Sequence, residues 1–300
     1  MGVLAAFVEG WKRTIAAPAT VFGMLAVTLL CALPVAILLH GQSQADEAVV
    51  AWNTGWATQF TYETLGFPGT IANISGWLNR GRVSPALAGA LAGYLGIWIF
   101  LSGGVLDRLA RARPIRTAAF FSACGGYFAR FLRLAVMAGL VYWALFRWLQ
   151  PYLVGSLHDR WTRNAAFLLA LMLVNVVVDF TKVRAVVEDR RSTLGAIAAS
   201  LRFLRRRPLR SAVLYLLNAL TLLLIVRLWY SFAYDAAAPD WTALVLSLVC
   251  LLLRLAAKLA LMASEIAFFQ GELAHAGYVV APVPVWPDSP AVEAIEKLSG

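Results

Sequence analysis

Charged residues are scarce in this chain. Lysine, arginine, aspartate and glutamate make up 14% of its 300 residues, whereas soluble domains typically contain about 25%. Hydrophobic residues account for 61% of the sequence. This composition excludes an ordinary soluble domain.

Cysteine and histidine are also rare, with three of each. The cysteines form no CxxC pair, which excludes a disulfide framework and leaves them as small packing residues. A metal site needs several converging ligands, and no stretch supplies them at helical spacing, so we expect no metal site and no cofactor. The residues concerned are Cys31, Cys124, Cys250, His40, His158 and His275.

The motifs that carry catalysis are missing. The sequence contains no HExxH, no G-x-S-x-G, no P-loop and no glycine-rich dinucleotide turn beside a strand. Glu188 and Asp189 form a carboxylate pair, but adjacent residues on a helix do not face each other. We therefore predict no catalytic residue.

The apolar residues come in blocks that match the width of a membrane. A hydrocarbon layer about 30 Å thick needs about 20 helical residues. The blocks do not alternate in the way that membrane strands do. We predict an all-α, polytopic bundle of six transmembrane helices in a membrane domain over 1–270. The predicted spans are 18–39, 85–106, 132–149, 161–180, 211–230 and 241–268.

Three amphipathic segments precede spans and are predicted to lie on the membrane surface as elbow helices, over 3–16, 115–130 and 192–207. In the third, Leu194, Ile197, Leu201 and Leu204 share one face, as expected for an interfacial helix. Ser192 is a candidate N-cap, and Pro208 begins the next span. For the first segment a signal peptide is the alternative, but the apolar run that follows exceeds the usual h-region of about 7–15 residues.

Two further stretches admit simple explanations. The loop over 40–84 is rich in tryptophan and tyrosine, which favours anchoring at the headgroup level over the alternative of a binding lid. Gly89 and Gly93 form a GxxxG pair with Gly96 near the same face, a pattern that lets helices approach closely. The residues after the last span, 271–300, are predicted to form a cytoplasmic tail.

An internal duplication is indicated at an offset of 72 residues. Asp107 corresponds to Asp179, and Arg130-Phe131-Leu132-Arg133 corresponds to Arg202-Phe203-Leu204-Arg205, both without a gap. The first elbow and span look like a third, more diverged copy. Three units, each an elbow followed by a hairpin, account for nearly the whole chain.

Basic residues concentrate on the side of the predicted elbows, which holds eighteen of the 26 lysines and arginines, against six in the opposite loops. The positive-inside rule therefore places both termini in the cytoplasm. Each basic residue near an anionic leaflet contributes about 1 kcal/mol of attraction, so anionic phospholipids are the expected partners and nucleic acid is not. The predicted headgroup-binding residues are Arg130, Arg133, Arg202, Arg205, Arg206, Arg207 and Arg210.

Several polar residues lie within the predicted spans. A basic side chain at the centre of a bilayer costs about 2.5–3.5 kcal/mol on insertion scales, so a polar network is one interpretation and snorkelling toward the cytoplasm is the other. The predicted network comprises Asp107, Asn175, Asp179, Asn218, Arg254, Lys258 and Glu265.

One passage carries a resemblance to a known group of proteins. Residues 179–208 read DFTKVRAVVEDRRSTLGAIAASLRFLRRRP. This arrangement resembles the exit, elbow and re-entry passage of bacterial six-span membrane proteins, including the membrane domains attached to some glycerophosphodiester phosphodiesterases. The likeness covers about residues 98–230 and implies a bacterial inner-membrane protein. The soluble phosphodiesterase domain has no counterpart here, so its activity is not implied.

Three functions remain open from the sequence. The first is a non-enzymatic accessory or scaffold subunit that binds anionic lipid, with a membrane-protein partner or self-association through the glycine-rich spans. The second is a transporter or lipid-handling protein that uses the charged patch within the spans. The third is an intramembrane enzyme.

Overall fold

The computed structural model describes residues 2–43, 85–156, 160–190, 192–233 and 240–275. The predicted loop over 40–84 and the tail lie almost wholly outside these ranges. Every regular element in the described ranges is a helix, which confirms the all-α prediction. The helices are α1 (Val3–Ile15), α2 (Pro18–Ser43), α5 (Pro85–Arg111), α6 (Thr117–Ala144), η2 (Leu145–Leu149), α7 (Gln150–Ser156), α8 (Arg160–Val187), α9 (Thr193–Arg206), α10 (Pro208–Ala233) and α11 (Asp240–His275).

Three helical stretches in the described residues are long and apolar enough to cross a membrane: Thr117–Ser156, Thr162–Val187 and Pro208–Trp229. A fourth passes this test when α1 and the first part of α2 are counted together, although the two are bent by 75°. The described residues therefore include several helices long and apolar enough to cross a membrane, but fewer than the six predicted spans.

Two of the predicted breaks between elbow and span are present. The first falls between α1 and α2, where Pro18 begins α2. The second falls between α9 and α10, where Pro208 begins α10. Proline suits the first turn of a helix, and its ring disfavours a helical conformation in the residue before it. Accordingly Arg207 leaves the helical region, at φ −140° and ψ 53°. At the other end of α9 the Gly195 amide donates to Ser192 Oγ at 3.2 Å, which is the predicted N-cap.

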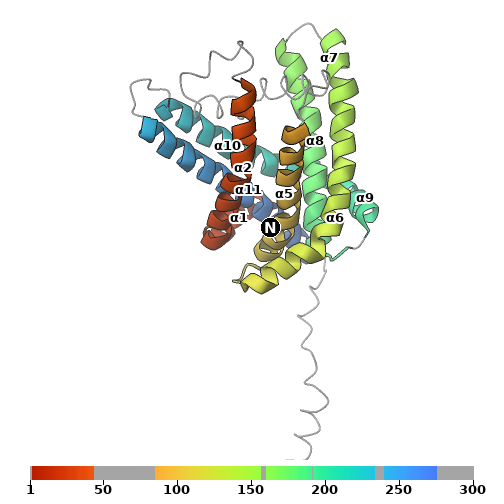
Figure 1. The fold of residues 1–300 in the computed structure, drawn as a ribbon. Helices are drawn as coiled ribbons and strands as arrows, with labels where there is room; N and C mark the ends of the chain where they lie inside the picture. The colour runs from red at the N-terminus through yellow and green to blue at the C-terminus, as the bar shows by residue number, and fades with distance from the viewer. Residues whose placement is uncertain (1, 44–84, 157–159, 191, 234–239, 276–300) are drawn as a thin grey trace, which may run out of the picture.

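The predicted boundary between the elbow over 115–130 and the span over 132–149 is not seen. Instead α6 runs unbroken through both, although Figure 1 shows its first part turned relative to the rest. At the offset of 72, Val136 stands where the other copy has Pro208, so nothing interrupts the backbone hydrogen bonds here. The helix also continues past residue 149, through the π-turn η2 into α7. That turn lies just before Pro151, which has no amide to donate to the preceding turn.

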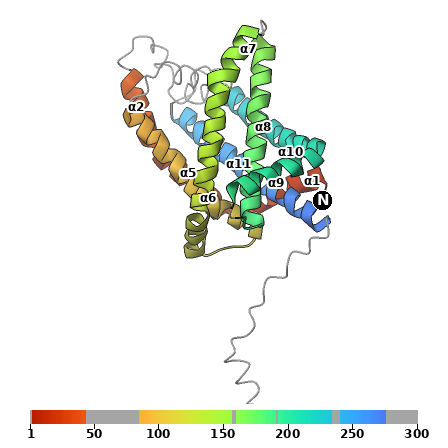
Figure 2. The ribbon, with the colours of Figure 1, turned by 90° about the vertical axis from the view of Figure 1, so that its right-hand side faces the viewer.

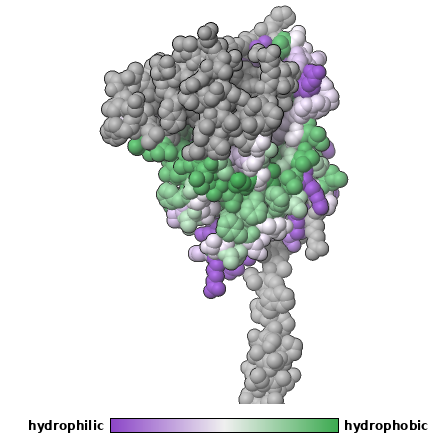
Figure 3. All heavy atoms as spheres, in the orientation of Figure 1, coloured by the Kyte–Doolittle hydropathy of each residue, from purple (hydrophilic) through white to green (hydrophobic). Residues whose placement is uncertain are grey.

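α11 is the central helix, and it packs against α1, α2, α5, α8 and α10. α6 pairs with α5 and α8, and Figures 1 and 2 both show α6 and α8 side by side. The main core is formed by α2, α5, α6, α8 and α11, and includes Leu106, Val183, Leu259 and Ile266. In Figure 1, α1, the first part of α6 and α9 gather at one end of the molecule. Figure 3 shows hydrophilic residues at that end, below a hydrophobic band.

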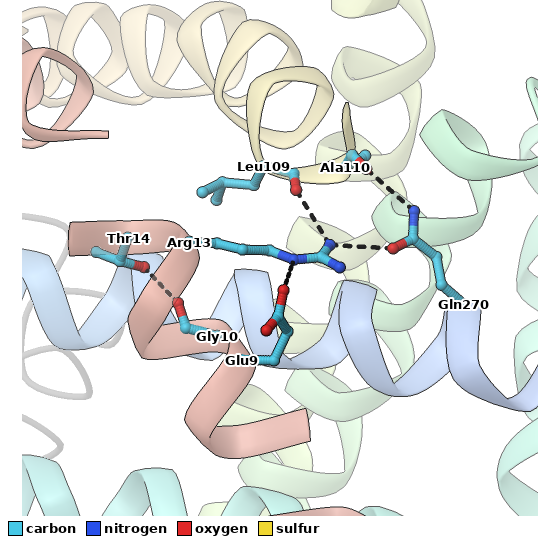
Figure 4. Close-up of polar contacts among 7 residues, drawn as sticks. All are labelled: Glu9, Gly10, Arg13, Thr14, Leu109, Ala110 and Gln270. Carbon is cyan, nitrogen blue, oxygen red and sulfur yellow. Dashed lines mark hydrogen bonds and ion pairs between the residues drawn. The ribbon is translucent and has the colours of Figure 1, made fainter. Parts of the chain in front are cut away.

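The two elbows α1 and α9 turn small residues toward the bundle and leave leucines exposed. In α1 the buried side is Ala6, Gly10 and Thr14, while Leu4 and Ile15 are 67% and 73% exposed. Figure 4 shows Gly10 and Thr14 on this helix, where the Thr14 hydroxyl donates to the Gly10 carbonyl at 2.9 Å.

In α9 the buried residues are Ala196, Ala199 and Ser200, while Leu194 is 68% exposed. Phe203 adds an anchor beside this buried face, with its ring centroid 5.5 Å from that of Phe180 on α8. Leu194 and Leu201 therefore lie on the outside, next to the arginine face, whereas Leu204 is partly buried and packs against the core.

The close approaches between helices occur at glycines other than the predicted pair. A Cβ on Gly104 would lie 2.6 Å from Cys124 Sγ, so α5 and α6 touch there. No described atom lies within 4 Å of such a Cβ on Gly89, Gly93 or Gly96. The GxxxG pair thus makes no close helix contact within the described part of the chain.

Candidate functional site

A buried acidic cluster lies where α8, α10 and α11 meet. Asp179 on α8 accepts the Tyr215 hydroxyl of α10 through Oδ2 at 2.9 Å. Its Oδ1 accepts Lys182 Nζ, also at 2.9 Å, one turn further along α8. The Asp179 carboxylate is therefore paired with one cation, Lys182, and accepts a hydrogen bond from one neutral donor, the Tyr215 hydroxyl. Lys182 was missed in the sequence although its spacing from Asp179 is readable, and Tyr215 was missed because it comes from another helix.

Glu265 of α11 completes this cluster. It is 1% exposed, and its charge lies close enough to Asp179 and Lys182 to interact with both. Its Oε1 atom has no hydrogen-bond partner among the described residues. No described lysine or arginine lies within 4.0 Å of its carboxylate. The cluster thus contains two acids and one directly paired cation.

The two basic residues of α11, by contrast, have no carboxylate partner. No described aspartate or glutamate lies within 4.0 Å of Arg254 or Lys258. The Lys258 ammonium lies 4.1 Å from the ring centroid of Trp98 on α5, a cation–π contact. Such a contact is worth about 0.5–2 kcal/mol, less than the ~2.5–3.5 kcal/mol that a cation costs at the bilayer centre. The Trp98 ring is therefore the direct partner of Lys258 among the described residues.

The other members of the predicted network lie in separate places. Asp107 pairs with Arg111 on its own helix at 2.9 Å. The Asn175 amide oxygen accepts the Tyr142 hydroxyl of α6. Asn218 donates to Ser264 Oγ at 3.3 Å, beside the crossing of α1 and α11. The structure therefore brings Asp179 and Glu265 together and places Lys258 nearby. Asp107, Asn175 and Asn218 make separate contacts elsewhere.

The predicted headgroup arginines fall into two groups. Some are engaged with acidic side chains: Arg130 pairs with Asp189 at 2.6 Å, and both Arg207 and Arg210 pair with Glu272. Glu272, on the last turn of α11, has a side chain only 3% exposed and was not predicted. The remaining four have exposed side chains without an acidic partner in the described chain, and they are Arg133, Arg202, Arg205 and Arg206.

A second polar junction holds the same end of the molecule together (Figure 4). Arg13 of α1 bonds Glu9 at 2.9 Å, Gln270 of α11 at 3.0 Å and the Leu109 carbonyl of α5 at 3.2 Å. Gln270 in turn donates to the Ala110 carbonyl at 3.1 Å. The last turn of α5 is thereby tied to α1 and α11. Arg13, predicted only as a topology determinant, is a structural residue.

The search for similar proteins gives no match to a family model, to a curated protein or to a solved structure. The class of protein therefore rests on the fold. The chain is an all-helical protein with helices able to cross a membrane, a basic end and charged residues inside its central helix.

Proposed function

We propose that this chain is a multi-pass protein of the bacterial inner membrane, with six spans and both termini in the cytoplasm. Its basic end binds anionic phospholipids, and the protein acts as a non-enzymatic accessory or scaffold subunit of a membrane complex. The observation that carries the proposal is the surface of α9. Its exposed leucines suit the acyl region, and its exposed arginines suit the phosphates directly above it.

The geometry of α9 supports this assignment in two ways. Its buried face fixes the helix against the bundle, so Leu194 and Leu201 are held outward. At 100° per residue, Arg202, Arg205 and Arg206 occupy the sector beside these leucines. Three such cations contribute about 3 kcal/mol of attraction to an anionic leaflet. An open face at Gly89, Gly93 and Gly96 on α5 is where a partner helix, or a second copy, would approach.

The test of lipid binding is a charge-neutral variant of α9, R202Q/R205Q/R206Q. The protein is extracted from bacterial membranes in polymer-bounded discs, and the phosphatidylglycerol fraction of the enclosed lipid is measured. We expect enrichment over bulk membrane for the wild type and its loss in the variant. The matched control is R147Q/R163Q/R227Q, which removes three charges from the opposite end. Equal enrichment in both variants would contradict the proposal.

The topology has its own test in a cysteine-free background. A cysteine replacing Ala198 on α9 should react with an impermeant maleimide only after the membrane is opened. A cysteine replacing Gly155 on α7 should react in intact spheroplasts. The reverse pattern would invert the proposed orientation, and reaction of both from outside would remove the six-span arrangement.

A second function is favoured by one specific observation, the unpaired Arg254 and Lys258 within α11. A transporter or lipid-handling protein requires charged groups that meet a polar substrate inside the membrane. The acidic cluster around Asp179 and Glu265 lies next to these cations and supplies groups of the opposite sign. A scaffold would not require any of these side chains, so their neutralisation separates the two functions.

A further inference from the structure

The two cations of α11 face an aromatic wall on α5. Lys258 lies over the Trp98 ring, and Arg254 lies near Tyr94. The Tyr94 and Trp98 rings meet edge to face, with centroids 6.4 Å apart and planes at 69°. The cations and the rings thus form one continuous surface between α5 and α11.

This surface has an excess of positive charge. On α8, Lys182 lies close enough to Lys258 for the two to repel each other. The nearest carboxylate of α8, Asp179, is already bonded to Lys182 and Tyr215. The missing partner for the pair on α11 is therefore an anion from outside the described chain.

The surroundings indicate what kind of anion fits. The Lys258 side chain is exposed rather than sealed in the core, so a ligand can reach it. Apolar side chains exposed on the same two helices include Leu95 on α5, and Val249 and Leu253 on α11. A free inorganic ion would gain nothing from these groups, whereas acyl chains would lie along them.

We infer that Arg254 and Lys258 bind the phosphate of an anionic amphiphile, with its acyl chains along α5 and α11. A guanidinium offers paired donors to a phosphate and an ammonium offers a point charge. Trp98 and Tyr94 then contact the carbons next to the phosphate. This inference rests on the second proposed function and names its substrate class. In this inference Glu265 and Asp179 do not contact the phosphate.

The experiment is native mass spectrometry of delipidated protein titrated with phosphatidylglycerol, with phosphatidylcholine and with sodium phosphate alone. We expect one phosphatidylglycerol to be retained, and R254Q/K258Q to bind it at least about tenfold more weakly, as expected for lost charge-assisted contacts. R227Q removes an exposed arginine near the far end of α10 and should bind as the wild type does. R254K/K258R keeps both charges and should retain binding within about tenfold of the wild type.

Each other outcome has a meaning. Equal retention of phosphatidylcholine, or unchanged binding by R254Q/K258Q, overturns the inference. If sodium phosphate at the same concentration displaces the lipid, the site binds a free anion. That result would contradict the inference that the ligand is an amphiphile. The α9 variant R202Q/R205Q/R206Q is titrated in parallel and should keep the retained lipid. Loss in that variant alone would assign the lipid to α9, which leaves the first proposal standing while this one fails.

A second measurement does not depend on changing any charged residue. Phosphatidylglycerol brominated near the headgroup should quench the fluorescence of Trp98, measured as the difference between the wild type and W98F. Brominated phosphatidylcholine should quench it less. Equal quenching by the two lipids would contradict the inference even if R254Q/K258Q failed to fold.

Discussion

One added methyl group at Gly10 tests the crossing of α1 and α11. A Cβ there would lie 2.6 Å from the Ser264 backbone nitrogen and 2.7 Å from the Ala260 carbonyl oxygen. Ordinary contact begins at 3.4 Å, so the two helices must separate by about 0.8 Å. Backbone atoms cannot turn aside as a flexible side chain can, so the whole of α1 has to move.

The size of the effect follows from two opposing contributions. Overpacking costs about 1–3 kcal/mol, and alanine gains up to about 1 kcal/mol over glycine in helix propensity. With overpacking near its middle value of about 2 kcal/mol and the full propensity gain of about 1 kcal/mol, we expect G10A to lose about 1 kcal/mol in free energy of unfolding. The measurement is unfolding by sodium dodecyl sulfate in mixed micelles, followed by circular dichroism.

The control is G23A in α2, where no described atom lies within 4 Å of the new Cβ. That variant should be as stable as the wild type or gain up to about 1 kcal/mol from propensity. If G10A proved as stable as G23A, α1 would not cross α11 at Ser264, and the account of a small-residue interface would be refuted.

The remaining predictions concern the basic end and the continuity of α6. E272Q removes the buried negative charge that pairs with Arg207 and Arg210, and should lower the free energy of unfolding by about 1–3 kcal/mol, measured in the same micelles. An unchanged value would mean that the charge of Glu272 contributes nothing. V136P places a proline inside α6 and should cost about 3 kcal/mol or more, whereas P208A at the start of α10 should change stability by less than about 1 kcal/mol. Similar losses in these two variants would show that the helix boundaries are wrong.

Local backbone chemistry made part of the fold predictable. Ser192 and Pro208 delimit α9 because a side-chain oxygen caps its first turn and an imino ring begins the next helix. Pro18 acts in the same way after α1. These signals depend only on neighbouring residues, and so a single sequence displays them.

The direction in which the elbows pack could not be predicted from hydrophobicity. Leucine is the stronger hydrophobe, and the stripe that contains Leu194 was predicted to lie in the membrane interface. That pattern does not indicate which face of the helix packs against the bundle. Within a membrane, however, lipid is as apolar as leucine, and close packing favours small residues. Gly10 and Ser200 therefore lie against the bundle, and the leucines lie outside.

The candidate site was predictable in part of its composition, because Asp179 and Glu265 were named, but not in its arrangement. The spacing of Arg254 and Lys258 places them one turn apart, and that relation is local. Whether either meets Asp179 or Glu265 depends on how α8, α10 and α11 cross, which no sequence spacing encodes. Tyr215 shows the difference, because its hydroxyl bonds Asp179 from another helix.

Two passages of similar sequence fold differently. They share the residues around Phe131 and Phe203, yet only the second has a break, and the two differ at Val136 and Pro208. Amphipathic character alone therefore does not separate an elbow from its span; the proline does.

The first elbow fits the same rule. Aligning Pro18 with Pro208 places Ala6 on Ala196 and Gly10 on Ser200, all of them buried. What α1 and α9 have in common is thus the small-residue face that docks the helix, and in both a proline begins the helix that follows.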